Sequence, residues 1–273
     1  MSLILRMEAG TDIGSVALAK NGRLLSLREN LEGKHHAQNL AVYVEEILRE
    51  NDLDADELDA VAVGKGPGSY TGLRIAVSLA KGICYATGKP LIAVNSLEAL
   101  VQVALEDFEA GILDLESLED AKLLPMIDAR RMEVYCQLFD AQARPLSEVE
   151  AHVLTAESFA AERAQGRLVL FGNGAAKSKM LFTEPGVHYV DVTPSARGLV
   201  KPATEALKIR KFEDVAYFEP FYLKNFVATS SSKNFFDYIC AVNIDPWCNG
   251  NTADSGSAFL GSSPGGSTKI SSA

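Results

Sequence analysis

The stretch Lys65-Gly66-Pro67-Gly68-Ser69-Tyr70-Thr71-Gly72-Leu73-Arg74 decides how this chain is interpreted. The apolar residues 58–63 before it predict a short buried strand, and residues 75–86 after it predict a helix. Free N–H groups at the first turn of a helix can bind an anion, which would give Ser69 a secondary role at a phosphate. However, no Gly-Lys-Ser/Thr closes the motif as in a Walker P-loop. By spacing alone, a tight strand-to-helix connection is the better interpretation.

The composition is that of a soluble globular protein with one large or two smaller domains: 273 residues, 47% hydrophobic and 23% charged. The net charge of −10 argues against direct, salt-driven binding of nucleic acid, so a basic partner would make such contacts. No signal peptide and no membrane-spanning stretch are expected. The four cysteines form no CxxC pair, which favours buried thiols in a reducing, cytoplasmic compartment.

The helix after the glycine corner is apolar on almost every side. Its only polar stripe consists of Arg74, Ser78, Lys81 and Tyr85. Small residues recur with four-residue spacing at Gly72, Ala76 and Ala80. A helix of this kind is buried on more than one side, and a flat strip lets another helix approach closely. Two interpretations stay open: a central helix inside one domain, or a helix covered by its own domain on one side and by a partner on the other.

Two strand–bend–strand–turn–strand units follow one another in the sequence. In the first, the bend begins at Glu8 and the turn is Asn21-Gly22; in the second, the bend begins at Asp128. This echo predicts a duplicated fold whose two bends face each other, each with one carboxylate. Such a pair can hold magnesium on a nucleotide. The default interpretation is that each carboxylate stabilises its own bend through Asx-type hydrogen bonds.

Three motifs in this order resemble the bacterial TsaB (YeaZ) family: the glycine corner, Val94–Leu100, and Asp128–Tyr135. The resemblance spans roughly residues 3–233. It implies an α/β fold of the actin/hexokinase/Hsp70-like type, built from two duplicated RNase H-like halves at 1–105 and 106–233.

The resemblance also implies a function in making threonylcarbamoyladenosine at position 37 of tRNAs that read ANN codons. The chain would be a scaffold subunit that pairs with TsaD, joined by TsaE, and would reach tRNA only through that complex. The catalytic relative carries metal-binding histidines in the segment where this chain has Asn95, Ser96 and Ala99. The four histidines form no i,i+4 pair, and no Ser/His/Asp or Cys/His arrangement is evident, so we assign no catalytic or metal-binding residue.

The scaffold interpretation places an interface with TsaD, or with a second copy, on helices at 35–50 and 73–85. Its predicted residues are Leu40, Val44, Ile47, Gly72, Leu73, Ala76, Val77 and Ala80. The candidates for weak or interface-bound ATP or ADP with Mg²⁺ are Glu8, Gly10, Thr11, Ser69 and Asp128. The family usually has acid-Thr-Ser-Thr at the first bend, and the loss of a hydroxyl at Ala9 argues against tight nucleotide binding. The alternatives are a sugar or acid kinase that uses Glu8 and Asp128 with magnesium, and an inactive metallopeptidase-like protein.

The composition changes after about Phe235. Only Asp245, Asp254 and Lys269 are charged between residues 238 and 273, and the stretch is rich in glycine and serine. We therefore predict a disordered tail at 234–273 outside the fold. In one reading frame, Gly261–Pro264 is encoded by the common tRNA T-arm GGTTCGAGTCC, and Trp247–Thr252 by a D-arm. The tail is thus interpreted as read-through into a neighbouring tRNA gene.

Overall fold

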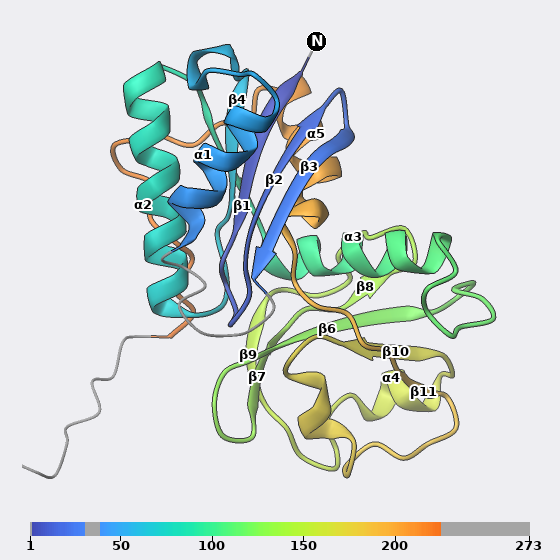
Figure 1. The fold of residues 1–273 in the computed structure, drawn as a ribbon. Helices are drawn as coiled ribbons and strands as arrows, with labels where there is room; N and C mark the ends of the chain where they lie inside the picture. Colours follow the sequence, from blue (N-terminus) through green and yellow to red (C-terminus); the bar gives the residue numbers. More distant parts are fainter. Residues whose placement is uncertain (1, 31–38, 225–273) are drawn as a thin grey trace, which may run out of the picture. The chain divides into compact units, whose positions relative to one another are not determined.

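The computed structural model describes residues 2–30 and 39–224 (Figure 1). Its first sheet has the strand order β3-β2-β1-β4-β5. The strands are β1 (Leu3–Glu8), β2 (Gly14–Lys20), β3 (Arg23–Asn30), β4 (Ala60–Gly64) and β5 (Leu91–Val94). β1, β2 and β3 run antiparallel in sequence order, whereas β4 and β5 continue the sheet parallel to β1.

The second sheet repeats this arrangement with the order β11-β10-β6-β7-β9, and β8 also pairs with β6. The strands are β6 (Lys122–Asp128), β7 (Glu133–Cys136), β8 (Phe139–Asp140), β9 (Glu150–Val153), β10 (Leu168–Phe171) and β11 (Val187–Tyr189). β6, β7 and β9 are antiparallel, and β10 and β11 are parallel to β6. Each strand of the first sheet has a counterpart with the same direction, so the predicted duplication of RNase H-like halves is confirmed.

The strand expected over residues 133–139 is divided into β7 and β8. Between them, the side chain of Gln137 donates to the carbonyl of Ser147, and the N–H of Leu138 donates to the Ser147 hydroxyl. These bonds replace the regular ladder, and an alternating apolar pattern alone gives no sign of them.

Five α-helices lie in the described residues: α1 (Leu40–Glu50), α2 (Tyr70–Thr87), α3 (Ser96–Glu109), α4 (Ala160–Ala164) and α5 (Val200–Lys208). Short 3₁₀ turns occur at η2 (Ala55–Glu57), η3 (Ala175–Ser178) and η4 (Ala196–Leu199). None of these helices combines the length and apolarity that crossing a bilayer requires. The first predicted helix was expected from residue 35, but residues 31–38 lie outside the described residues.

α1 and α2 cover one face of the first sheet, and α5 covers the other (Figure 1). Two packing contacts join the predicted halves, whose boundary was expected between residues 105 and 106. Apolar residues of α3, such as Leu100, pack in a core cluster with Phe171 of the second half. Ala203 of α5 packs with Ile4 of the first sheet. The packing therefore does not follow a single cut in the chain, and the predicted tail at 234–273 lies outside the described residues.

Candidate functional site

The glycine corner between β4 and α2 packs tightly against the bend that follows β1. A side chain at Gly68 or Gly72 would overlap the carbonyl groups of Gly10 and Ala9, respectively. The N–H of Ser69 donates to the Gly10 carbonyl at 2.6 Å. The Ser69 hydroxyl caps α2 by accepting from the N–H of Gly72 at 3.3 Å, which explains why the helix begins earlier than residue 75. The hydroxyl and the N–H of Ser69, the residue with a possible role at a phosphate, are thus engaged with the protein's own backbone.

Glu8 ends β1 and is buried, with 1% of its surface exposed. Its carboxylate accepts from the N–H of Gly10 at 2.6 Å and from the hydroxyl of Ser96 at 3.0 Å. Gly64 of β4 lies directly beside it, because a side chain there would overlap the carboxylate. Burial raises the pKa of Glu8, and the hydrogen bonds from Gly10 and Ser96 oppose that rise. Glu8 therefore ties β1 to the start of α3.

The other nucleotide candidates near Glu8 also have local roles. Thr11 is buried, and its hydroxyl accepts from the N–H of Ile13 at 3.3 Å. Gly10 both donates to Glu8 and accepts from Ser69. A side chain at Gly10 would come within 2.9 Å of the Glu8 carboxylate. The bend therefore needs glycine for its own packing, and binding of ATP or ADP by these residues stays a prediction.

Asp128 occupies in the second half the place that Glu8 has in the first. Its carboxylate is exposed, accepts from the N–H of Arg130, and pairs with the Lys177 ammonium at 2.7 Å. This is the Asx-type arrangement expected by default. No interaction joins Asp128 to Glu8 in the described parts of the chain, nor do three or more acidic, histidine or cysteine side chains gather there as a metal site.

The eight residues predicted to form the partner interface lie in the interior of the first half. All are buried: Leu40, Val44, Ile47, Gly72, Leu73, Ala76, Val77 and Ala80. The strip of small residues faces the protein's own sheet, because Gly72 must approach the carbonyl of Ala9. These residues position the two helices, and a partner would instead contact the side chains that point outward.

The outward side of α2 carries the predicted polar stripe and a second, half-buried apolar row. Arg74, Ser78 and Tyr85 are exposed. The half-buried row consists of Ile75, Leu79 and Ile83. Gly82 is also exposed, and outside the helix's own backbone no atom of the described residues lies within 4 Å of the place where its side chain would begin. The outward side of α2 is therefore open, and small residues there alternate with larger ones.

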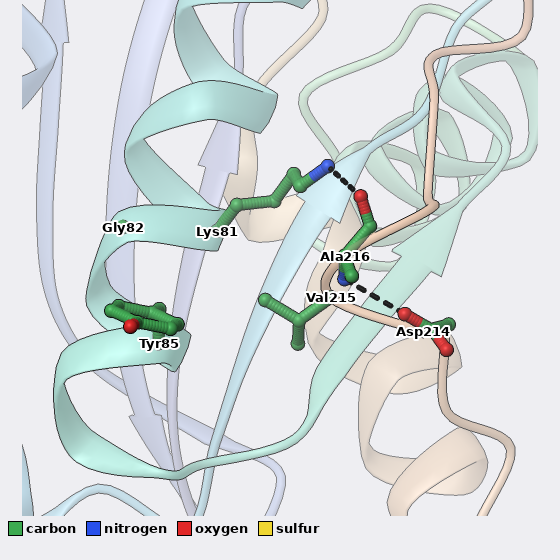
Figure 2. Close-up of a pocket in the computed structure, with 6 residues that line it drawn as sticks. All are labelled: Lys81, Gly82, Tyr85, Asp214, Val215 and Ala216. Carbon is green, nitrogen blue, oxygen red and sulfur yellow. Dashed lines mark hydrogen bonds between the residues drawn. The ribbon is translucent and has the colours of Figure 1, made fainter.

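The C-terminal segment of the described chain runs beside α2 (Figure 2). The Lys81 ammonium donates to the carbonyls of Ala216 at 3.1 Å and Phe218 at 3.0 Å, which fixes the segment on the helix. Between them lies an open hollow of about 680 Å³. Its lining residues are Lys81, Gly82, Tyr85, Asp214, Val215 and Ala216. Nothing in the sequence pattern indicates this contact with α2.

A second hollow of about 300 Å³ continues along the same side of α2, towards the glycine corner. Tyr70 and Tyr222 stack there with ring centroids 4.7 Å apart. Arg74 lies over the Tyr70 ring and donates to its hydroxyl at 2.9 Å. The N–H of Phe221 donates to the carbonyl of Lys65, so the segment also contacts the corner itself. Together, the outward side of α2 and residues 214–222 form one continuous surface, which we call the α2 surface.

One serine–histidine–glutamate arrangement exists that the sequence did not reveal. His152 lies 2.8 Å from the Ser158 hydroxyl through Nε2, and 3.1 Å from Glu150 through Nδ1. The Ser158 oxygen also accepts from the N–H of Thr155 at 2.9 Å, and Ser158 is buried. Because the Thr155 N–H donates to it, Ser158 serves the turn before α4, and its hydroxyl is not presented to a substrate. Of the other histidines, 35 and 36 lie outside the described residues.

Comparison with known proteins gives the family. The model for TsaD, tRNA N6-adenosine threonylcarbamoyltransferase, matches residues 30–230. The chain is 31% identical to the TsaB protein of Escherichia coli over 82% of this chain and 96% of that protein. A match to the Haemophilus influenzae TsaB protein, at 32% identity, spans 51% of that protein. The structure of YeaZ from Pseudomonas aeruginosa superimposes with a TM-score of 0.67 at 27% identity and is covered completely by 82% of this chain. The chain therefore belongs to the TsaB (YeaZ) family of tRNA threonylcarbamoyladenosine biosynthesis proteins.

Proposed function

We propose that this chain is a non-catalytic scaffold subunit in threonylcarbamoyladenosine synthesis, and that it binds TsaD through the α2 surface. The names of the E. coli and H. influenzae relatives support the pathway. TsaE would join the pair, and tRNA would be reached through the complex, in keeping with the net charge of −10. A second copy of the chain is the alternative occupant of the same surface.

The proposal rests on the presence of a glycine, Gly82, on the exposed side of α2. A glycine inside a helix lowers stability by about 0.8–1 kcal/mol relative to alanine. Among the described residues, nothing outside the helix's own backbone lies within 4 Å of its missing side chain, so the described packing gives no reason for a glycine in this continuous helix. Gly72 differs, because its neighbours leave no room for a side chain. Close approach of another molecule at Gly82 would explain why a destabilising residue stands there.

A catalytic role for the chain has less support. A kinase of this fold would need Glu8 and Asp128 free to hold magnesium, and the structure engages Glu8 with Gly10 and Ser96, and Asp128 with Lys177. We therefore expect no ATP turnover by the isolated chain. Any ATP or ADP would be bound weakly or at the interface with TsaD, where the partner supplies further contacts.

The test compares stability with TsaD binding in the same variants. Gly82→Ala is expected to raise the free energy of unfolding by about 0.5–1 kcal/mol, because helix propensity improves and nothing is crowded. The same variant should weaken co-purification with TsaD from the same genome, and Gly82→Arg should abolish it while the chain stays folded. Ala161→Arg, at an exposed small residue of α4, is the matched control.

Two results would decide against the α2 surface. If Gly82→Arg binds TsaD as well as the unchanged chain does, TsaD does not contact the α2 surface. Loss of TsaD binding by Ala161→Arg as well would show that added charge, and not its position, is responsible. Ala76→Arg is unsuitable as an interface test, because Ala76 is fully buried and the variant is expected to unfold.

A further inference from the structure

The segment from Ile244 to Thr268 lies beyond the residues that the family model matches. The TsaD family model ends at residue 230, and 82% of the chain already accounts for all of the P. aeruginosa structure. We propose that this segment is a translated tRNA gene: its codons have a second function, as a transfer RNA, and its amino acids have none in the protein. This inference does not depend on the proposed function.

The D-arm and T-arm suggested by the tail extend into complete stems. Trp247 to Thr252 is written TGG-TGY-AAY-GGN-AAY-ACN, where Y is a pyrimidine and N is any base. The bases GTGY and AYAC in this run are complementary and would form the D-stem. The loop between them contains the GG that is typical of D-loops. Leu260 to Gly265 supplies CTNGG and CCNGG around the T-loop TTCGAGT, with one G·T pair in the stem, when Leu260 uses CTN, Ser262 uses TCG and Ser263 uses AGT.

An anticodon arm lies between these two arms, in the same frame. Ala253 to Ala258 reads GCN-GAY-TCN-GGN-TCN-GCN when Ser255 and Ser257 use TCN, one of the two codon families for serine. With that choice, the ends GCNGA and TCNGC are complementary at every specified base. The loop between them, YTCNGGN, begins with a pyrimidine followed by T, as anticodon loops do, and it leaves CNG as the anticodon.

The two ends of the segment then pair as an acceptor stem. Asp245-Pro246 gives GAYCCN, and the third base of Gly265 followed by Gly266 and the first two bases of Ser267 gives NGGNTC. These strands are complementary at every specified base when Ser267 uses TCN. With these serine and leucine codons, four stems follow one another in the order of a tRNA and in one continuous frame. The composition is the consequence of the tRNA, since GG and TC recur in its stems and loops.

The encoded tRNA is not a substrate for the proposed pathway. The base after the anticodon is fixed as G, because it is the second base of the Gly256 codon. The modification acts on an adenosine at that place, so the adjacency of this tRNA to the protein's coding region carries no functional link.

The nucleotide sequence of the gene tests the proposal, because the third bases of several codons are free in the protein but constrained in the tRNA. We expect complementary third bases, G·T included, in at least four of the five codon pairs that face each other. These pairs are Ile244 with Ser267, Asp245 with Gly266, Pro246 with Gly265, Ala253 with Ser257, and Leu260 with Pro264. Fewer complementary pairs, or a TCN codon at Ser263 where the T-loop needs AGT, would overturn the proposal.

The protein itself supplies the second test. A chain ended after Lys233 is compared with the full chain for thermal midpoint and for co-purification with TsaD. Equal values are expected, whether or not TsaD binds, so the result is independent of the proposed interface. A lower thermal midpoint, or TsaD binding by the full chain alone, would show that the translated segment has acquired a role in the protein.

Discussion

Replacing Glu8 with glutamine should change how the stability of this protein depends on pH. Burial raises the pKa of Glu8 above its ordinary value of 4.5, so between that value and the raised pKa the folded chain holds a proton that the unfolded chain has lost. The free energy of unfolding therefore falls as pH rises through this window, by up to about 1.4 kcal/mol per pH unit for this one group. Below pH 4.5 both states are protonated, and the group contributes its full stability.

Glutamine has nearly the same shape as glutamate and cannot ionise. Its carbonyl oxygen can accept from the N–H of Gly10, and its amide can donate to the Ser96 hydroxyl, so the local bonds are kept. We expect Glu8→Gln to lose the decline in stability above pH 4.5 and to be more stable than wild type at neutral pH. Glu8→Ala should lose about 2–4 kcal/mol, because the N–H of Gly10 is left without its partner.

Urea unfolding followed by circular dichroism, at steps from pH 4 to pH 8, measures this difference directly. Glu45→Gln makes the same chemical change at an exposed position of α1 and is the matched control. The reasoning is refuted if Glu8→Gln declines with pH as steeply as wild type. It is equally refuted if Glu8→Gln is several kcal/mol less stable at every pH, since that would show that the carboxylate charge itself holds the bend.

Three further predictions concern the core. Gly72→Ala should lower the free energy of unfolding by about 1–3 kcal/mol in urea titrations, because the added carbon overlaps the Ala9 carbonyl. Arg6→Met should raise it by about 1–4 kcal/mol in the same assay, because the Arg6 guanidinium is fully buried and, among the described residues, no carboxylate pairs with it and no acceptor faces its Nε. A loss of stability would show that the hydrogen bonds of Arg6 outweigh its desolvation. Cys84 and Cys136, with pKa values raised by burial to about 11 and about 12, should resist thiol reagents at pH 7.5 until urea unfolds the chain, as peptide mapping would show.

The duplicated architecture could be predicted from sequence because its signals are local. The hairpin at Asn21-Gly22, the bends after Glu8 and Asp128, and the period of two in the strands all act within a few residues. The observed strands β1 and β6 end at Glu8 and Asp128, where the two predicted bends begin. Strand directions then follow, since each half uses a hairpin first and crossover connections afterwards.

The inward side of α2 could not be identified in the same way. A helix that is apolar on nearly every side offers two candidate surfaces, and the small residues suggested contact with a partner. The structure shows that Gly72 is small because the carbonyl of Ala9, far away in sequence, lies against it. The signal for the outward side was nevertheless present, in the polar stripe that contains Ser78 and Tyr85. Polarity, more than residue size, therefore indicates which side of α2 is exposed.

The two carboxylates show why matching positions in a duplicated fold do not imply matching chemistry. Glu8 and Asp128 stand at the ends of corresponding strands, yet one is enclosed by Gly10, Gly64 and Ser96 and the other pairs with Lys177 in solvent. A serine at position 96 supplies the hydroxyl that binds Glu8, and it stands in the segment where the catalytic relative was expected to carry metal-binding histidines. Ser96 is therefore one of the residues that argue against a metal site, and it is also the hydrogen-bond partner of Glu8 in the interior. The Ser96 hydroxyl also accepts from the N–H of Gly66, so the interaction that holds Glu8 also fixes the glycine corner from which α2 starts, as the proposed scaffold role requires.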